Sequence, residues 1–462
     1  MSDPARPPVT GPAPGPAPGP APGSGRVSEL GRVLRLDARR TALLVAVPLL
    51  AGLGAVTAWL SLVPGVGYWD NSVVALGDAV RLLGPVAAAL AAWAALRERR
   101  LDHVRDLSPR SPATGALHDL MLLSGAALVA HAGVTAVIVA ETLSRHEAGR
   151  PHPLGPSAGA AALVLHVVAG YLAGRVAPRA ATPVAVGLAA VAWSSLRAPG
   201  GSWVGLLPPA VFGRVGLFTQ LRTGVLADQV VWAAGLTAVL VLGYVAWVTR
   251  RALPLLPLAV AVGLVVVATF RLESADGRAV AAVPVEHVCR EWPLTVCVHP
   301  ALREALPSLT TAVTPLATRL TGTPGEFARV EQRPPTEPAR VAGGVAVVHL
   351  GDELTPGYEA RAVRQIRDGL VVARTCPVPA AGYRALVDAW LVGEALPALP
   401  DAHAVRRFGA WNEDRRRAWL RAHFAAYRTC SLRAADFRPG RSRVRVPRTK
   451  KAAPVRTRPD DR

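Results

Sequence analysis

The chain has 462 residues, 51% of them hydrophobic, with a mean hydropathy of +0.30 and a formal net charge of +20. This composition argues against an ordinary soluble protein and indicates a membrane protein. The only lysines are Lys450 and Lys451. Because a P-loop and a Schiff-base enzyme both need a lysine, neither can lie before residue 450. We therefore expect no ATP hydrolysis by this chain alone, no enzymatic activity and no cofactor or metal.

The first 30 residues carry the Pro/Gly/Ala repeat GPAPGPAPGPAP, which has no apolar side chains large enough to form a core. They are predicted to be a disordered cytoplasmic tail with polyproline II character. They do not form a signal peptide, because the first apolar run begins only near Thr41.

Residues 31–271 are predicted to form a transmembrane domain with about seven helices, since each apolar segment approaches the length needed to cross a hydrocarbon core of about 30 Å. The segments are 41–63, 73–96, 116–140, 158–176, 183–197, 228–248 and 253–270. The fifth segment is the shortest.

Arginines in the short loops predict the orientation, because cytoplasmic loops carry an excess of basic residues. They follow the second, fourth and sixth segments, as Arg97, Arg99, Arg100, Arg105 and Arg110, then Arg175 and Arg179, then Arg250 and Arg251. We therefore expect a multi-pass plasma-membrane protein with a cytoplasmic N-terminus and an extracytoplasmic C-terminal domain.

Every cysteine follows the last apolar segment, as Cys289, Cys297, Cys376 and Cys430. An even set confined to the outer part favours two disulfides. Of the possible pairings we favour Cys289 with Cys297 and Cys376 with Cys430. The alternative is that these are small buried thiols in a cytoplasmic domain.

Residues 272–437 read as a small α+β domain. Helical patterns cover 299–322, 383–396 and 411–430, the last with Asn412 as its cap and Trp419, Leu420, Phe424 and Tyr427 on its buried side. FARVEQ and GVAVVHL read as strands. The basic segment 438–462 is predicted to be a disordered tail that contacts anionic lipid headgroups. It has no interleaved aromatic residues that could stack on bases, so we expect no nucleic-acid partner.

Ionisable residues also fall inside the apolar segments, where a charge is costly. Asp78 and Arg81 lie three residues apart and can pair on one helical face. His131 and His166 lie near mid-span. A transport or proton-relay role is conceivable for these histidines, but one interhelical hydrogen bond is the commoner role.

The charged stretch ALRERRLDHVRDLSPRSP, residues 95–112, separates the second and third segments. Leu101, Val104 and Leu107 recur at a three-residue spacing among charged residues, which predicts a short amphipathic helix at the cytoplasmic face. Such a segment either only keeps this loop on the cytoplasmic side through its charges, or inserts its apolar side chains into a groove of a partner protein. The residues that would dock are Arg99, Arg100, Leu101, Val104 and Leu107.

The charged stretch and its flanks resemble a loop of permeases from ATP-binding-cassette transporters, of the drug and polysaccharide exporter class in its actinobacterial form. The residues are AAWAALRERRLDHVRDLSPRSPATGALHDLMLL, and the loop in those permeases connects helices two and three. The stretch RAPGGSWVGLLPPAVFGRVGLFTQLRTGVLADQ is similar to the partly re-entrant outer region of that family. Residues 288–332, which begin VCREWPLTVCVHPALREALPSL, resemble an outer domain of such permease-like proteins. The seventh helix and the outer domain depart from the family's six helices and cytoplasmic C-terminus.

The resemblance implies a permease subunit that exports an unidentified substrate, with a separate cytoplasmic ATPase subunit docked on the 99–107 loop. It also implies a dimer with itself or a second permease, surrounded by membrane lipid. The competing hypothesis is a non-transporting membrane protein whose outer domain senses or binds a surface ligand.

Overall fold

The computed structural model describes residues 43–61, 68–99, 112–145, 148–373 and 375–438. The chain divides into two compact units, residues 1–286 and 287–462. The sequence placed this boundary after residue 271. Residues 272–286 cluster with the first unit because they contain β2 (Val280–Ala282), which pairs with β1 (Thr219–Leu221) of that unit.

The described part of the first unit consists mainly of apolar helices. These helices are α2 (Leu43–Ser61), α3 (Trp69–Arg99), α5 (Pro112–Ser144), α6 (Leu154–Val176), α7 (Thr182–Ser195), α8 (Thr223–Thr249) and α9 (Leu255–Ser274). Five of them, α3, α5, α6, α8 and α9, are long and apolar enough to cross a membrane. A mostly helical chain with membrane-type helices and a small sheet-containing C-terminal region, as predicted, is therefore confirmed.

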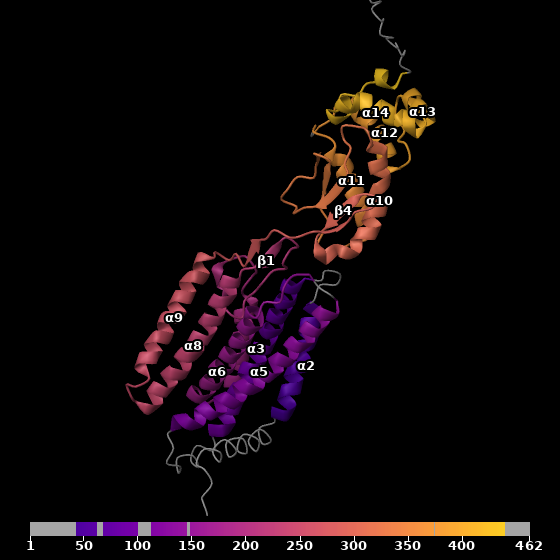
Figure 1. The fold of residues 1–462 in the computed structure, drawn as a ribbon. Coiled ribbons are helices and arrows are strands. Elements are labelled where there is room, and N and C mark those ends of the chain that lie inside the picture. Colours follow the sequence, from indigo (N-terminus) through magenta and orange to yellow (C-terminus); the bar gives the residue numbers. More distant parts are fainter. Residues whose placement is uncertain (1–42, 62–67, 100–111, 146–147, 374, 439–462) are drawn as a thin grey trace, which may run out of the picture. The chain divides into compact units, whose positions relative to one another are not determined.

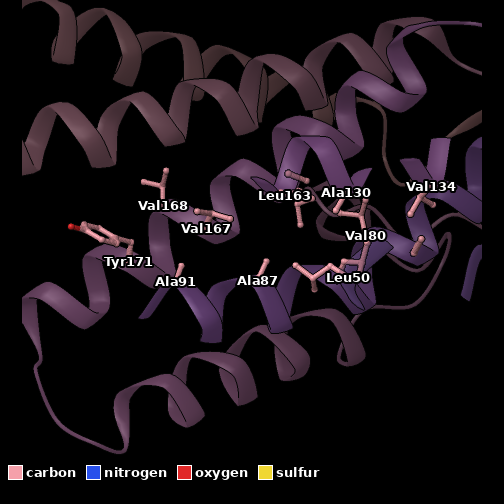
Figure 2. Packing of buried hydrophobic residues seen from close by; sticks show 14 of the residues in the cluster. Leu50, Val80, Ala87, Ala91, Ala130, Val134, Leu163, Val167, Val168 and Tyr171 are labelled. Atoms are coloured by element: carbon pink, nitrogen blue, oxygen red, sulfur yellow. The ribbon is translucent and has the colours of Figure 1, made fainter. Parts of the chain in front are cut away.

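The core of the first unit lies between α3 and α6, with α2 and α5 packed alongside (Figure 1). Tyr171 and Val167 of α6 lie opposite Ala87 and Ala91 of α3 in Figure 2. Small residues dominate the α3 side because helices within lipid associate by close backbone packing. A Cβ placed on Gly174 of α6 would lie 2.5 Å from the carbonyl oxygen of Ala92, so this crossing requires glycine.

Helices α8 and α9 pack against each other, and α8 also packs against α6 (Figure 1). Their outer faces expose large apolar side chains, including Leu256, Val260 and Phe270 of α9. Exposed apolar side chains over the length of a helix indicate contact with lipid, because lipid tails are as apolar as the side chains themselves.

A short β-ribbon forms one end of this unit. β1 and β2 pair antiparallel, and α3 is fastened to the segment around them. The Tyr68 hydroxyl donates to the Thr219 carbonyl at 2.8 Å, and Asp70 accepts from the Leu221 N–H at 3.1 Å. We call this the ribbon end. The opposite end, where α3, α6 and α8 terminate, is the basic end, with Arg97, Arg99, Arg175, Arg179, Arg250 and Arg251.

The second unit contains a five-stranded sheet of order β3-β4-β5-β7-β6. Its strands are β3 (Val288–Arg290), β4 (Thr295–Val298), β5 (Arg329–Gln332), β6 (Val341–Ala342) and β7 (Val345–Val348). β4, β5 and β7 run parallel, whereas the edge strands β3 and β6 pair antiparallel. The predicted strands FARVEQ and GVAVVHL correspond to β5 and β7, and both are largely buried, as parallel strands usually are.

The described helices of this unit are η2 (Pro300–Ala305), α10 (Leu306–Leu320), α11 (Tyr358–Gly369), α12 (Val378–Val392), α13 (Ala402–Ala410), α14 (Glu413–Arg428) and η3 (Ala434–Phe437). The sheet packs against α10 and α11, whereas α12 and α14 of the same unit pack on helices. The predicted cap of α14 is confirmed: Asn412 Oδ1 accepts from the Arg415 N–H at 2.9 Å. The predicted buried side of α14 is also confirmed, and Trp419 packs on Phe408 and Phe437.

Candidate functional site

The docking segment expected from the sequence lies mostly outside the described residues. Arg100, Leu101, Val104 and Leu107 belong to the undescribed range 100–111. Arg99 is described, at the end of α3, where its Nη1 donates to the carbonyl oxygen of Arg175 at 3.0 Å. The end of α3 is thereby fastened to the last turn of α6.

The other helix that flanks this segment is fastened to α6 as well. Asp119 lies in the second turn of α5 and is only 4% exposed. Its carboxylate accepts a hydrogen bond from the fully buried Tyr171 hydroxyl at 2.8 Å. A buried carboxyl group without a hydrogen bond destabilises the folded protein. Packings of α5 on α6 that keep the Tyr171–Asp119 hydrogen bond are therefore favoured over packings that break it. Both helices that enter and leave the 100–111 segment are thus held to neighbouring turns of α6.

The intramembrane polar residues have separate partners. Arg81 Nη1 lies 3.2 Å from Asp78 Oδ1, and its Nη2 donates to the Ser194 carbonyl of α7 at 3.2 Å. The His131 ring lies 3.1 Å from the Pro156 carbonyl, which joins α5 to α6. The His166 ring bonds the Ala162 carbonyl of its own helix at 2.7 Å. The Arg81–Ser194 and His131–Pro156 contacts join two helices, whereas the His166 contact lies within α6, and none of them by itself defines a relay.

Arg197 is a buried anchor that the sequence interpretation missed. Its guanidinium donates to four carbonyl oxygens, those of Trp193 at 2.8 Å, Val204 at 3.5 Å, Leu207 at 2.5 Å and Pro209 at 2.9 Å. It therefore holds the irregular stretch between α7 and α8 onto the end of α7. An arginine directly after an apolar segment was the available signal.

A recess opens near the ribbon end between α3, α6, α8 and the stretch around Pro208. Its empty space of about 340 Å³ includes the solvent at its opening, and the enclosed part is small. Its lining consists of Val73, Gly77, Val80, Gly155, Ala158, Gly159, Ala162, Pro208, Pro209, Ala210, Phe212, Leu226 and Gln229. Gln229 contributes the polar side chain of this lining, and that side chain is only 2% exposed.

The second unit contains both disulfides, which join Cys289 to Cys297 and Cys376 to Cys430. The first links directly opposite residues of β3 and β4. Beside the second, Arg384 Nη1 lies 3.3 Å from Cys376 Sγ, and Arg384 Nε donates to Asp388 at 3.2 Å. Among the described residues, no group of three or more His, Cys, Asp or Glu side chains is arranged to hold a metal ion.

No family model, no curated protein and no solved structure matches this chain. The described residues define a class: a bundle of apolar, membrane-type helices followed by a disulfide-bonded α+β unit.

Proposed function

We propose that this chain is the membrane-embedded permease subunit of an ATP-driven exporter, working with a separate cytoplasmic ATPase that docks on residues 99–107. In this proposal α2 and α7 cross the membrane along with the five longer helices, which makes seven spans. The basic end faces the cytoplasm, as the excess of arginine there favours. The disulfide-bonded unit lies outside the plasma membrane, because disulfides persist in oxidising compartments.

The observation that carries the proposal is the attachment of both docking-loop helices to α6. Arg99 ties α3 to the Arg175 turn, and Tyr171 ties α5 to the same region one turn earlier. A force applied to the segment between α3 and α5 would therefore move α3, α5 and α6 together. An ATPase that docks on that segment needs such a connection to reach the transmembrane helices.

The stretch between α7 and α8 at the ribbon end is the part of the chain that the resemblance assigns to the outer side. The irregular stretch between α7 and α8 is held by Arg197, and Asn71 fixes its far part through the Val215 N–H at 3.0 Å. This stretch would form an outer cover over the helices, as the resemblance implies. The resemblance also implies that two permease subunits pair, either two copies or this chain with a second permease.

The test is co-purification of the tagged protein from its native membrane with any nucleotide-hydrolysing partner. We expect Leu101→Asp together with Leu107→Asp to reduce recovery of the ATPase at least tenfold, because two carboxylates would have to be buried in the partner's groove. Leu253→Asp is the matched control, since Leu253 lies at the same end in the α8–α9 connection and is 85% exposed. Full recovery of the ATPase with the double variant would overturn the docking assignment.

A second function is favoured by one feature, the independent core of the second unit with both disulfides. In this alternative the helices only anchor an outer unit that binds a surface ligand. The same purification separates the two: if no ATPase accompanies wild type, Leu253→Asp or the double variant, the anchoring role is favoured and the permease proposal fails.

A further inference from the structure

The recess near the ribbon end has the composition of a binding site for an apolar group. Glycine and alanine of α6 form its floor, and Val73, Gly77 and Val80 of α3 form one wall. Leu226 and Gln229 of α8 form the facing wall, and the Pro208–Phe212 stretch covers it. The enclosed part has room for little more than one water-sized group, so a ligand would insert one functional group and leave the rest of its body in the opening.

Gln229 supplies an independent observation. Its Nε2 is buried and has no hydrogen-bond partner among the described residues. A buried amide that donates no hydrogen bond destabilises the folded protein by about 1–3 kcal/mol. Such groups are therefore rare, and their partner is often a water molecule or a ligand. Gln229 is one of the residues that line the recess, so a ligand bound there could bring an acceptor atom to this amide.

If α8 spans a bilayer, the recess would lie near one membrane interface, where lipid ester groups are found. Gln229 is the seventh residue of α8, which puts it about 9 Å along the helix from the ribbon end. The α6 residues of the floor, 155–162, fall in the first turns after Leu154. In a bilayer whose hydrocarbon core is about 30 Å thick, this is the outer part of one leaflet, close to the interface.

We infer that this recess binds the uncharged acyl ester group of a lipid-like amphiphile, with the Gln229 amide donating to the ester carbonyl oxygen. The apolar lining disfavours a phosphate or carboxylate, because a charge buried without a counter-charge is strongly destabilised. This inference does not depend on the ATPase.

The test uses the full-length protein in detergent and the methyl ester of a sixteen-carbon fatty acid that carries a photoreactive diazirine. Cross-linked positions are mapped by peptide mass spectrometry, with unlabelled methyl palmitate or hexadecane as competitor. We expect labelling in residues 155–162 and 223–229. We also expect methyl palmitate to compete about three- to tenfold better than hexadecane, the ratio that one neutral hydrogen bond provides.

Two variants complete the test. Gln229→Leu should reduce the competition ratio to near one while leaving the ligand-free thermal midpoint unchanged or higher, because it removes an unpaired buried amide. Val231→Leu, on the same helix at a position 39% exposed, should keep the wild-type ratio. A ratio near one in wild type, a ratio retained in Gln229→Leu, or labelling spread evenly along α9 would each overturn the inference.

Repeating the labelling with a diazirine-bearing diacyl phospholipid distinguishes the source of the ester. Labelling of the same peptides by the phospholipid identifies a resident membrane lipid. Labelling by the methyl ester alone identifies a single-chain ester ligand. Both results support the ester site, whereas labelling of these peptides by neither probe contradicts it.

Discussion

Two carboxyls of the second unit, Asp388 and Asp401, have contrasting surroundings. Asp388 of α12 accepts from the Tyr427 hydroxyl at 2.6 Å and from Arg384 Nε at 3.2 Å. Burial raises the pKa of Asp388 above its ordinary value, although the Tyr427 hydrogen bond and the Arg384 charge act in the opposite direction. Asp401 is the contrasting case: the Ala404 N–H that it caps lowers the pKa of its exposed carboxyl.

The first prediction concerns the pH dependence of these two carboxyls. A raised native pKa means that the native state holds the proton more tightly. The contribution of Asp388 to stability is therefore fully present below the unfolded pKa, about 3.9, and is lost as pH rises through the native pKa. Wild type should gain stability relative to Asp388→Asn as the pH falls from 7 towards 4.

Hydrogen exchange of peptides from α12, α13 and α14 in the full-length protein measures this difference. Asp401→Asn serves as the control of opposite sign: because its native pKa is lowered, its contribution is present above the unfolded pKa, about 3.9, and wild type should lose stability relative to this variant only as the pH falls below that value towards the native pKa. A difference between wild type and Asp388→Asn that stays constant with pH would contradict the assignment.

At the scale of elements, the α3–α6 contact depends on the absence of side chains. Gly170 and Gly174 of α6 face the backbone of α3 at Ala88 and Ala92. In these positions an added methyl group meets a carbonyl oxygen, which cannot rotate away as a flexible side chain can. The two helices that carry the core, and that lead towards the docking segment, are therefore held at a separation that only glycine allows.

The second prediction follows from this contact. Gly170→Ala should lower the free energy of unfolding by about 1–3 kcal/mol, because overpacking forces the helices apart. The control is Gly243→Ala on α8, where a Cβ would meet nothing within 4 Å; this change should be neutral or stabilise by up to about 1 kcal/mol. Thermal unfolding of both purified variants measures the difference. Equal midpoints for the two would show that α3 and α6 can separate at no cost.

At the scale of the whole molecule, the two units differ in the forces that stabilise them. The first exposes apolar side chains over much of its helices, as a lipid-embedded bundle does, whereas the second has a buried aromatic core and disulfides. Apolar outer faces are typical of helices in lipid, and disulfides are typical of an oxidising aqueous compartment.

The third prediction concerns orientation. A membrane-impermeant maleimide should label Glu337→Cys, an exposed position of the second unit, in intact cells. Ala252→Cys, exposed in the α8–α9 connection at the basic end, should be labelled only after permeabilisation. The reverse pattern would invert the topology and would move the proposed ATPase segment to the wrong side of the membrane.

Much of the fold was accessible from the sequence because its causes are local. Runs of apolar residues predicted the helices of the first unit, and Asn412 predicted the start of α14. β3 was missed, because a three-residue edge strand with exposed side chains has no pattern of its own. The candidate site was accessible in part: Arg99 and the intramembrane polar residues were identified, but not Asp119, Arg197 or Gln229 as buried groups.

By itself, the sequence determined the class of molecule: apolar segments long enough for a bilayer, arginines concentrated in alternate connections, and cysteines confined to the last part of the chain. Each of these depends on composition within a short stretch. Only the tertiary structure decided which groups meet, such as Tyr171 with Asp119 and Arg197 with Pro209, and which remain unpaired, such as the Gln229 amide. Hydrogen bonding in a buried site depends on atoms brought together from distant parts of the chain, and no local pattern records that proximity.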